Sequence, residues 1–156
     1  MEIFSDYINN ELGYLVIRGG IDKIISVSFE DKEPVAGETN GVVKECKSQL
    51  IEYFSGSRKV FSVPLELQGT DFQVDVWNEL MKIPFGEVIT YTALAQRLGG
   101  VKKLRAVGLA NSKNPINIIV PCHRVIGKDG KLVGYGGGLW RKRWLLDFES
   151  HRLNLF

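Results

Sequence analysis

The chain has 156 residues, of which 44% are hydrophobic and 24% are charged, and its formal net charge is only +2. This composition is typical of a globular protein with one core or two small ones, and it excludes a disordered chain, collagen and a coiled coil. No apolar run approaches the roughly 20 residues of a membrane-spanning helix, and the N-terminus lacks the basic start and apolar core of a signal peptide, so we expect a soluble, cytoplasmic protein.

The first part of the chain predicts a small antiparallel sheet followed by one helix. Residues 4–8, 14–18 and 24–29 are rich in β-branched and aromatic side chains and are separated by Asn and Gly. Residues 41–54 then place apolar side chains on one helical face, and a glycine follows as a stop signal. Cys46 lies on this face, so we expect it in the core, without a chemical role.

The next predicted helix follows a short linking stretch. Residues 60–68 are read as a strand or a connector, and Thr70 and Gln73 then stand at the spacing of a capping box. Apolar side chains recur at helical spacing from there until Pro84 ends the helix. The apolar face of this helix consists of Phe72, Val76, Trp77, Leu80 and Ile83.

Two further helical stretches have the order of a helix-turn-helix. Residues 92–98 and 101–112 are joined through Gly99 and Gly100, and the second stretch carries basic side chains. In a helix-turn-helix the second helix enters a groove of DNA. A helical hairpin whose basic face is only solvated is the alternative interpretation.

Charge is unevenly divided along the chain. Residues 1–68 carry 7 basic and 11 acidic side chains, a net −4, whereas residues 69–156 carry 13 basic and 7 acidic ones, a net +6. This asymmetry indicates that the second part meets a polyanion and that the first part is a scaffold or docking piece. The alternative is an incidental imbalance of solvated side chains.

The rest of the chain predicts a hairpin, a loop and a last helix. Residues 125–133 have Asp-Gly in the middle and predict a β-hairpin. The glycine-rich residues 134–138 predict a flexible loop, and a helix follows over residues 139–149. The apolar face of that helix holds Trp140, Trp144, Leu145 and Phe148, and Arg141, Lys142 and Arg143 are expected on a solvated face.

Cys122 is the candidate nucleophile. It stands between Pro121 and His123 among basic residues, where nearby cations and the start of a helical turn are expected to depress the thiol pKa. His123 would need a carboxylate to orient it, and Asp147 and Glu149 of the last helix are the candidates. A papain-like thiol hydrolase is the competing class, but it places cysteine and histidine far apart in sequence.

The segments around Cys122 form a longer pattern. They read FGEV at 85–88 with Tyr91 after it, RAVG at 105–108, IVPCHRVI at 119–126 and GGL at 137–139. Together they resemble the O6-alkylguanine-DNA alkyltransferases, and the resemblance runs from about residue 70 to residue 149. Residues 1–68 match that family only in length and general pattern.

The resemblance implies a DNA repair reaction. Such a protein flips O6-alkylguanine, mainly O6-methylguanine, out of double-stranded DNA and transfers the alkyl group irreversibly to its cysteine, here Cys122. One protein molecule would then repair one lesion. The resemblance assigns His123 as the base that acts through a water, Glu149 as the residue that orients His123, and Tyr91 as the general acid for the departing guanine.

The resemblance also implies how DNA and the flipped base are held. Arg105 matches the arginine that fills the vacated stack, on a helix that sits in the minor groove. Asn114 matches the residue that ties this helix to the active-site turn, and Tyr135 the aromatic that lines the base pocket. The other expected DNA contacts are Lys102, Lys103, Ala106, Gly108 and Ala110, and the other expected substrate contacts are Arg124, Val125 and Gly136.

Two positions depart from part of the family. Gly136 stands where some members carry a serine, and Asn117 stands where some carry a proline. Both departures argue against tight binding of benzyl-type substrates, and neither affects methyl transfer. The N-terminal part also lacks the extra Cys and His that bind a structural zinc in some members, so we expect no metal and no cofactor.

The resulting prediction is an α/β protein in two domains that acts as a monomer on damaged DNA, with no membrane partner. Residues 1–68 form a scaffold of a small sheet with a helix, ribonuclease H-like by resemblance. Residues 69–156 form a helical, winged-helix-like domain with the helix-turn-helix and the active-site cysteine. A relative that recognises lesions without reacting would lack Cys122, and a transcription regulator would need a further domain.

Overall fold

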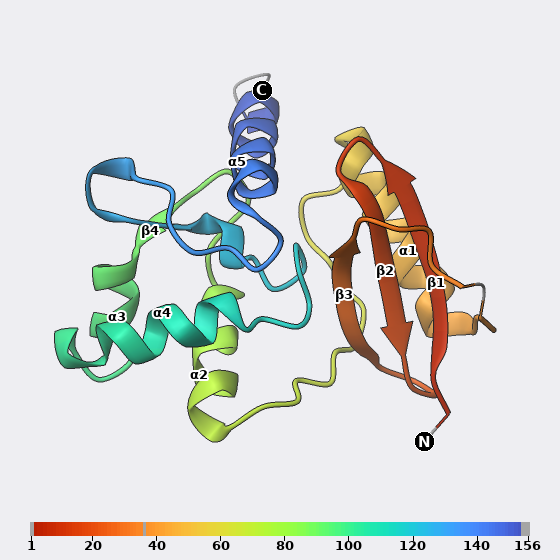
Figure 1. Cartoon of the computed structure of the whole chain (residues 1–156), viewed down its shortest axis with the longest axis horizontal. Helices are drawn as coiled ribbons and strands as arrows, with labels where there is room; N and C mark the ends of the chain where they lie inside the picture. The colour runs from red at the N-terminus through yellow and green to blue at the C-terminus, as the bar shows by residue number, and fades with distance from the viewer. Residues whose placement is uncertain (1, 36, 154–156) are drawn as a thin grey trace. The chain divides into compact units, whose positions relative to one another are not determined.

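The computed structural model describes the backbone of residues 2–35 and 37–153 and the side chains up to residue 151. The chain forms two compact units, residues 1–68 with 115–117 and residues 69–114 with 118–156 (Figure 1). None of the described helices is long and apolar enough to cross a membrane.

The first unit contains the predicted antiparallel sheet. Its strands are β1 (Phe4–Asn10), β2 (Gly13–Gly19) and β3 (Ile24–Glu30), hydrogen-bonded in the order β1-β2-β3. In the register of the sheet Ile17 lies opposite Val27, and both side chains are fully buried. Because side chains alternate along a strand, one face of the sheet is apolar, and α1 covers a face of the sheet in Figure 1.

Helix α1 (Gly41–Ser55) confirms the prediction at both ends. The Asn40 side chain accepts a hydrogen bond from the Val43 amide at the start. Gly56 ends the helix with a φ of 87°, the left-handed conformation that glycine adopts without strain. Cys46 is fully buried, and burial raises the pKa of its thiol to about 12, so it is a core residue as expected.

The boundary between the units differs from the predicted one at residues 115–117. The Val27 amide donates to the Pro115 carbonyl at 2.9 Å, and the Asn117 amide donates to the Val27 carbonyl at 2.8 Å. The segment therefore satisfies the outer edge of β3, and Leu65 bridges to Ile24 on the same strand. Residues 60–68 otherwise form a connector, one of the two forms predicted for them.

The second unit begins with α2 (Asp71–Leu80). The capping box is confirmed, because the Thr70 amide donates to Gln73 at 3.0 Å and the Gln73 amide donates to Thr70 at 3.1 Å. The Trp77 indole is buried and donates to the Ala110 carbonyl at 2.9 Å, which ties α2 to α4.

The helix-turn-helix is also confirmed. It consists of α3 (Tyr91–Arg97), a short 3-10 turn (Val101–Lys103) and α4 (Leu104–Ser112), and α3 packs against α4 (Figure 1). The second predicted stretch is therefore α-helical only from Leu104 onward.

The predicted hairpin over residues 125–133 is wrong. Strand β5 (Val125–Ile126) pairs in parallel with β4 (Ile89–Thr90), and a 3-10 turn (Lys128–Gly130) follows. Asp-Gly does form a tight turn there, closed by a hydrogen bond from the Gly127 amide to the Lys131 carbonyl at 2.7 Å. The chain pairs with β4 in place of folding back on itself.

The last helix, α5 (Leu139–Leu153), buries only part of the predicted face, since Trp144 and Phe148 are half-buried. Leu145 is fully buried as expected, but Trp140 is 55% exposed. The side chains that share the buried face with Leu145 are charged, namely Arg141, Lys142 and Glu149. Each of them has hydrogen-bonding partners inside the unit, as the site shows.

Candidate functional site

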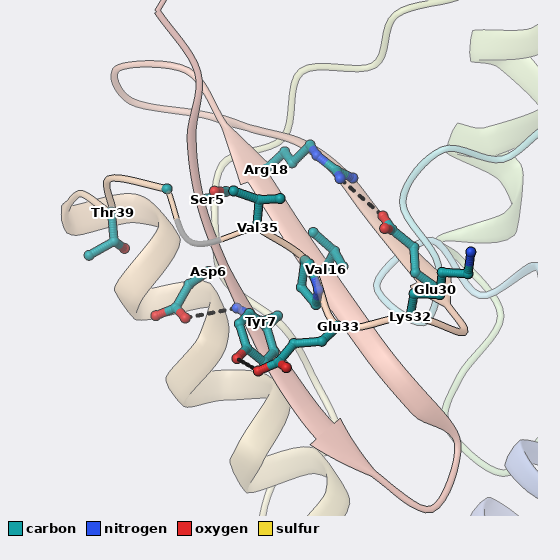
Figure 2. A pocket seen from close by; sticks show the side chains of 12 residues that line it. Ser5, Asp6, Tyr7, Val16, Arg18, Glu30, Lys32, Glu33, Val35 and Thr39 are labelled. Carbon is teal, nitrogen blue, oxygen red and sulfur yellow. Dashed lines mark hydrogen bonds and ion pairs between the residues drawn. The ribbon is translucent and has the colours of Figure 1, made fainter.

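The first unit holds a groove of about 600 Å³ on the sheet and under the segment that follows β3 (Figure 2). Its polar side chains partner one another, since Arg18 lies 3.0 Å from Glu30 and the Tyr7 hydroxyl donates to Glu33 at 3.0 Å. No thiol or imidazole is among the described residues that line it. The hydroxyls and the lysine that line this groove therefore have no thiol or imidazole beside them in its described lining, and the candidate site lies in the second unit, with Cys122 and His123.

Cys122 opens a one-turn 3-10 helix (Cys122–Arg124) after a buried apolar segment. Its amide donates to the Val120 carbonyl at 2.8 Å, and the side chain is only 2% exposed. Ile118 in the preceding segment has a φ of 72°, which is strained for a β-branched residue. Strain of this kind is found where the surrounding structure imposes a special geometry.

Beside Cys122 lies a buried cluster of His123, Arg124 and Glu149. His123 Nε2 is 2.7 Å from Glu149 Oε2, and Arg124 donates to both Glu149 oxygens at 2.8 and 3.0 Å. Arg124 also donates to the Ile83 carbonyl at 2.6 Å. His123 and Glu149 were expected to meet, and the fold brings them together across 26 residues. Asp147, the other candidate, is 70% exposed and pairs with Arg143.

The charges in this cluster fix the tautomer of His123. Burial alone would raise the pKa of Glu149, but His123 and Arg124 hold it well below its usual range. Burial lowers the pKa of His123, so the imidazole is neutral at pH 7. Because the carboxylate only accepts, Nε2 carries the proton, and Nδ1 is an acceptor with no hydrogen-bond partner among the described residues.

The thiol itself contradicts one expectation. Burial raises the pKa of Cys122 from 9.0 to about 11, whereas the sequence predicted a depressed value. A hydrogen bond from the Asn114 side chain and the charge of Lys142 both oppose this rise, but they are the weaker effects. The resting protein therefore holds a neutral thiol.

Lys142 is a site residue that the sequence analysis placed on a solvated face, and that expectation is wrong. Its side chain is fully buried, and Nζ donates to the carbonyls of Val133 at 2.9 Å and Gly134 at 3.4 Å. Burial lowers the pKa of Lys142 to about 8. Arg141 is also buried and donates to the Gly137 carbonyl at 2.9 Å.

Tyr91 converges on the same loop from the start of α3. Its hydroxyl donates to the carbonyls of Val133 at 2.9 Å and Gly134 at 3.2 Å. Gly134 has a φ of 60°, and a Cβ there would lie 3.3 Å from the Tyr91 oxygen. Glycine thus allows the loop to approach both the phenol and the Lys142 ammonium.

Asn111 of α4 is a second residue that the sequence analysis missed. It is 1% exposed, and its Nδ2 donates to the Tyr91 hydroxyl at 3.2 Å and to the Cys122 carbonyl at 3.3 Å. No residue spacing could have revealed it, because a buried Asn in a helix and a surface Asn look alike in sequence.

The residues expected to contact DNA divide by exposure. Lys102, Lys103, Arg105 and Ala106 are exposed, Gly108 is half-buried, and Ala110 is buried against Trp77. A groove of about 650 Å³ runs along α4. Its described lining includes Tyr91, Arg105, Gly108, Lys128 and Gly134.

Of the residues expected to bind the substrate, Asn114 and Tyr135 interact with Cys122. Asn114 donates to the Val120 carbonyl at 2.7 Å, which joins the end of α4 to the active-site segment. Tyr135 is 8% exposed, and its hydroxyl has no hydrogen-bond partner among the described residues. Val125 is buried in β5, and Gly136 is exposed. Arg124 lies on Glu149, where it holds the carboxylate.

Two family models match the chain and together cover nearly all of it. The 6-O-methylguanine DNA methyltransferase, ribonuclease-like domain matches residues 3–67, and the 6-O-methylguanine DNA methyltransferase, DNA binding domain matches residues 71–151. The chain belongs to the 6-O-methylguanine DNA methyltransferase family. The sheet unit of this methyltransferase family member corresponds to the first match, and the unit with Cys122 corresponds to the second.

Relatives of this methyltransferase share much of its sequence and fold. A methylated-DNA–protein-cysteine methyltransferase of Mycobacterium leprae is 54% identical over 114 residues, which are 73% of this chain and 69% of the relative. One of Methanosarcina mazei is 47% identical over 137 residues, 86% and 87% of the two chains. The crystal structure of Mycobacterium tuberculosis OGT in complex with DNA gives a TM-score of 0.86 at 42% identity and covers 96% of this chain and 94% of that chain.

Proposed function

We propose that this protein repairs O6-alkylguanine, mainly O6-methylguanine, in double-stranded DNA by transferring the alkyl group to Sγ of Cys122. The observation that carries the proposal is a cysteine beside a buried, oriented imidazole in the unit that matches the DNA-binding family domain. Relatives named for methyl transfer from DNA to a protein cysteine support the same chemistry.

The reaction is a displacement at a saturated carbon. The thiol proton passes through a water to Nδ1 of His123, which the Glu149 contact leaves as an acceptor. The sulfur then bonds to the alkyl carbon while the bond from that carbon to O6 breaks, with its electron pair going to the base. Tyr91 supplies the proton that makes guanine a neutral leaving group, and water returns the histidine proton to the phenolate.

The high pKa of the thiol fits this sequence of steps. A thiol that is neutral at rest does not react with passing electrophiles, and it becomes a nucleophile only when the proton acceptor and the substrate are both in place. Lys142 favours the thiolate by charge. The thioether product is a poor leaving group, so one molecule repairs one lesion.

In this proposal the helix-turn-helix binds DNA. Arg105 is exposed beside the groove that Tyr91 lines, where it can fill the gap left by a flipped base. Lys102 and Lys103, in the 3-10 turn just before α4, suit phosphate contacts, which hold DNA of any sequence. Ala106 and Gly108 leave room for a minor groove, and buried Ala110 supports the helix from below.

The two parts of the chain have different roles in the proposal. Residues 1–68 form the scaffold domain, and residues 69–156 form the domain for DNA binding and alkyl transfer. Every group that the reaction needs comes from one chain, so we propose that the protein acts as a monomer. We propose a cytoplasmic location, where the reducing environment keeps the Cys122 thiol free.

The first prediction tests the reaction itself. After incubation with a duplex oligonucleotide that contains one O6-methylguanine, the intact mass should rise by one methyl group in place of one hydrogen. The gain should saturate at one per chain and map to Cys122. Cys122→Ala should abolish the gain and still bind the oligonucleotide, and Cys46→Ala should leave it unchanged. Binding without any mass gain in the unmodified protein would favour lesion recognition without reaction.

A further inference from the structure

Asn111 connects the two reacting sides of the site through one amide group. Its Nδ2 donates to the carbonyl of Cys122 at 3.3 Å and to the hydroxyl of Tyr91 at 3.2 Å. The first partner belongs to the turn that carries the thiol, and the second is the phenol at the start of α3. A single side chain thus spans the nucleophile turn and the phenol.

The orientation of this amide is fixed by its partners. A carbonyl oxygen accepts hydrogen bonds and never donates, so the atom that faces Cys122 must be the NH₂ group. The same NH₂ group faces Tyr91, and an NH₂ group only donates. The phenolic oxygen therefore accepts from Asn111, and its own proton must point to another acceptor. That acceptor is the loop, at the carbonyls of Val133 and Gly134.

The rest of the amide shows that it does more than fill the core. Oδ1 is buried and has no hydrogen-bond partner among the described residues. A buried amide kept only for packing is normally satisfied on both sides, because each unsatisfied polar atom is costly. Asn111 gives up half of its hydrogen bonds while its NH₂ group serves Tyr91 and Cys122.

We propose that Asn111 is a positioning residue that prepares Tyr91 to give its proton to the departing base. The inference rests on the proposed function and deepens it. In the resting protein the Tyr91 hydroxyl donates its proton to the loop carbonyls of Val133 and Gly134 in a hydrogen bond. When the base occupies the site, the Asn111 hydrogen bond keeps the proton aimed away from α4, and it strengthens as negative charge develops on the phenolic oxygen.

The surroundings of Tyr91 explain why such help is needed. Burial raises the pKa of Tyr91 above its ordinary value, the nearby Cys122 raises it further, and the hydrogen bond from Asn111 lowers it. The charged groups that face the phenol are Lys142, with Nζ 5.5 Å from the ring centroid, and Arg105 and Lys128 in the same groove. Asn111 is uncharged, and its amide bonds directly to the phenolic oxygen at 3.2 Å.

A titration of Tyr91 tests this role without any substrate. Carbon-13 at Cζ of tyrosine reports phenol ionisation by NMR, and Tyr91→Phe identifies the signal. Asn111→Leu should raise the Tyr91 pKa relative to the unmodified protein. Gln49→Leu is the matched control, because Gln49 is equally buried at 1% but lies in the first unit, and it should leave the Tyr91 pKa unchanged. An unchanged Tyr91 pKa in Asn111→Leu would overturn the proposal.

Kinetics separate positioning from packing. Asn111→Leu should slow methyl transfer from duplex DNA about tenfold, as expected for one hydrogen bond to a general acid. In a Tyr91→Phe background the same substitution should cause no further loss, because it acts through the phenol. An equal loss in both backgrounds would show a structural role for Asn111 and contradict a role through Tyr91. Asn111→Ala, which suits a helix, replaces Asn111→Leu if the latter does not fold.

The two readouts distinguish this proposal from the proposed function. If the unmodified protein gains no methyl group on Cys122, the alkyl-transfer function fails, and with it the role of Asn111 in proton donation. If methyl transfer occurs but the Tyr91 pKa is unchanged in Asn111→Leu, or the loss of rate is equal in both backgrounds, only the positioning role fails.

Discussion

Glu149 sets the charge balance and the orientation of the two buried side chains beside it, His123 and Arg124. Its Oε2 accepts from His123 and Arg124, and its Oε1 accepts from Arg124 and the Gly86 amide at 3.3 Å. One carboxylate thereby neutralises a buried guanidinium and fixes a neutral imidazole. A buried ion pair of this kind adds little net stability, but removing one partner is costly.

The second prediction concerns this carboxylate. Glu149→Gln keeps the shape but leaves Arg124 buried without a counter-charge, so the free energy of unfolding should fall by about 3–5 kcal/mol at pH 7. Because the pKa of Glu149 is lowered on folding, its contribution is present above the unfolded value of about 4.3 and is lost as pH falls below it. Urea unfolding at several pH values should show the difference between the two proteins shrinking in acid.

Asp147→Asn is the control for that measurement. Asp147 lies on the same helix two residues away but is 70% exposed, so the substitution should change the free energy of unfolding by less than about 1 kcal/mol. The interpretation of Glu149 would be wrong if both variants lost the same free energy.

At the scale of helices and strands, local sequence rules predicted correctly those features whose hydrogen-bond partners lie within a few residues. The capping box at Thr70 and the glycine stop at Gly56 satisfy backbone groups within a few residues, and both are present as predicted. The hairpin after Val125 failed because the choice between folding back and pairing with β4 depends on a segment 36 residues earlier. Secondary structure set by distant partners could not be read from local signals.

Helix α5 shows that site residues, too, cannot be predicted from the sequence when their partners are distant. A basic side chain at position 142 predicts a solvated face, since lysine is rarely buried without a partner. The partners of Lys142 are carbonyls of the Val133–Gly134 loop, which has no charge or motif in the sequence. Cys122 and His123 could be singled out from their neighbours in the sequence and Tyr91 from the family resemblance, whereas Lys142 and Asn111 required the structure.

The third prediction follows from the charged face of α5. Lys142→Met keeps the apolar stem but removes the charge that favours the Cys122 thiolate, so methyl transfer at saturating DNA should slow about tenfold at pH 7. The pKa of Lys142 is about 8, so the unmodified protein loses this advantage as pH rises above that value. The ratio of the two rates should therefore fall between pH 7 and pH 9.

Arg143→Met provides the comparison for Lys142. Arg143 is the next residue on α5 but is 68% exposed, and its substitution should leave the first-order rate of transfer unchanged. A loss in Lys142→Met that is the same at every pH would indicate a packing role for Lys142 and contradict the electrostatic one.

For the whole molecule, charge and structure divide the chain in nearly the same place. The net charges of −4 before residue 69 and +6 after it match the division into a sheet unit and a helical unit with the candidate site. A polyanion is attracted to the basic part and repelled by the acidic part, which orients encounters before any specific contact forms. The composition of each half could be read from the sequence, but the crossing of residues 115–117 into the sheet unit could not.

The last prediction concerns Arg105 and the DNA duplex. If Arg105 fills the gap left by the flipped base, Arg105→Ala should slow repair of O6-methylguanine in a duplex on the order of a hundredfold, because turning a base out costs a few kcal/mol. Attack on the free O6-methylguanine base needs no flipping and should change little. Arg97→Ala removes a positive charge from the neighbouring helix α3 and should slow repair of the duplex only slightly, through weaker attraction to phosphates, and leave attack on the free base unchanged. Rates of methyl transfer from the duplex and from the free base measure the two effects. Equal losses for Arg105→Ala on both substrates would mean that Arg105 acts in the chemistry or in stability and does not hold the duplex open.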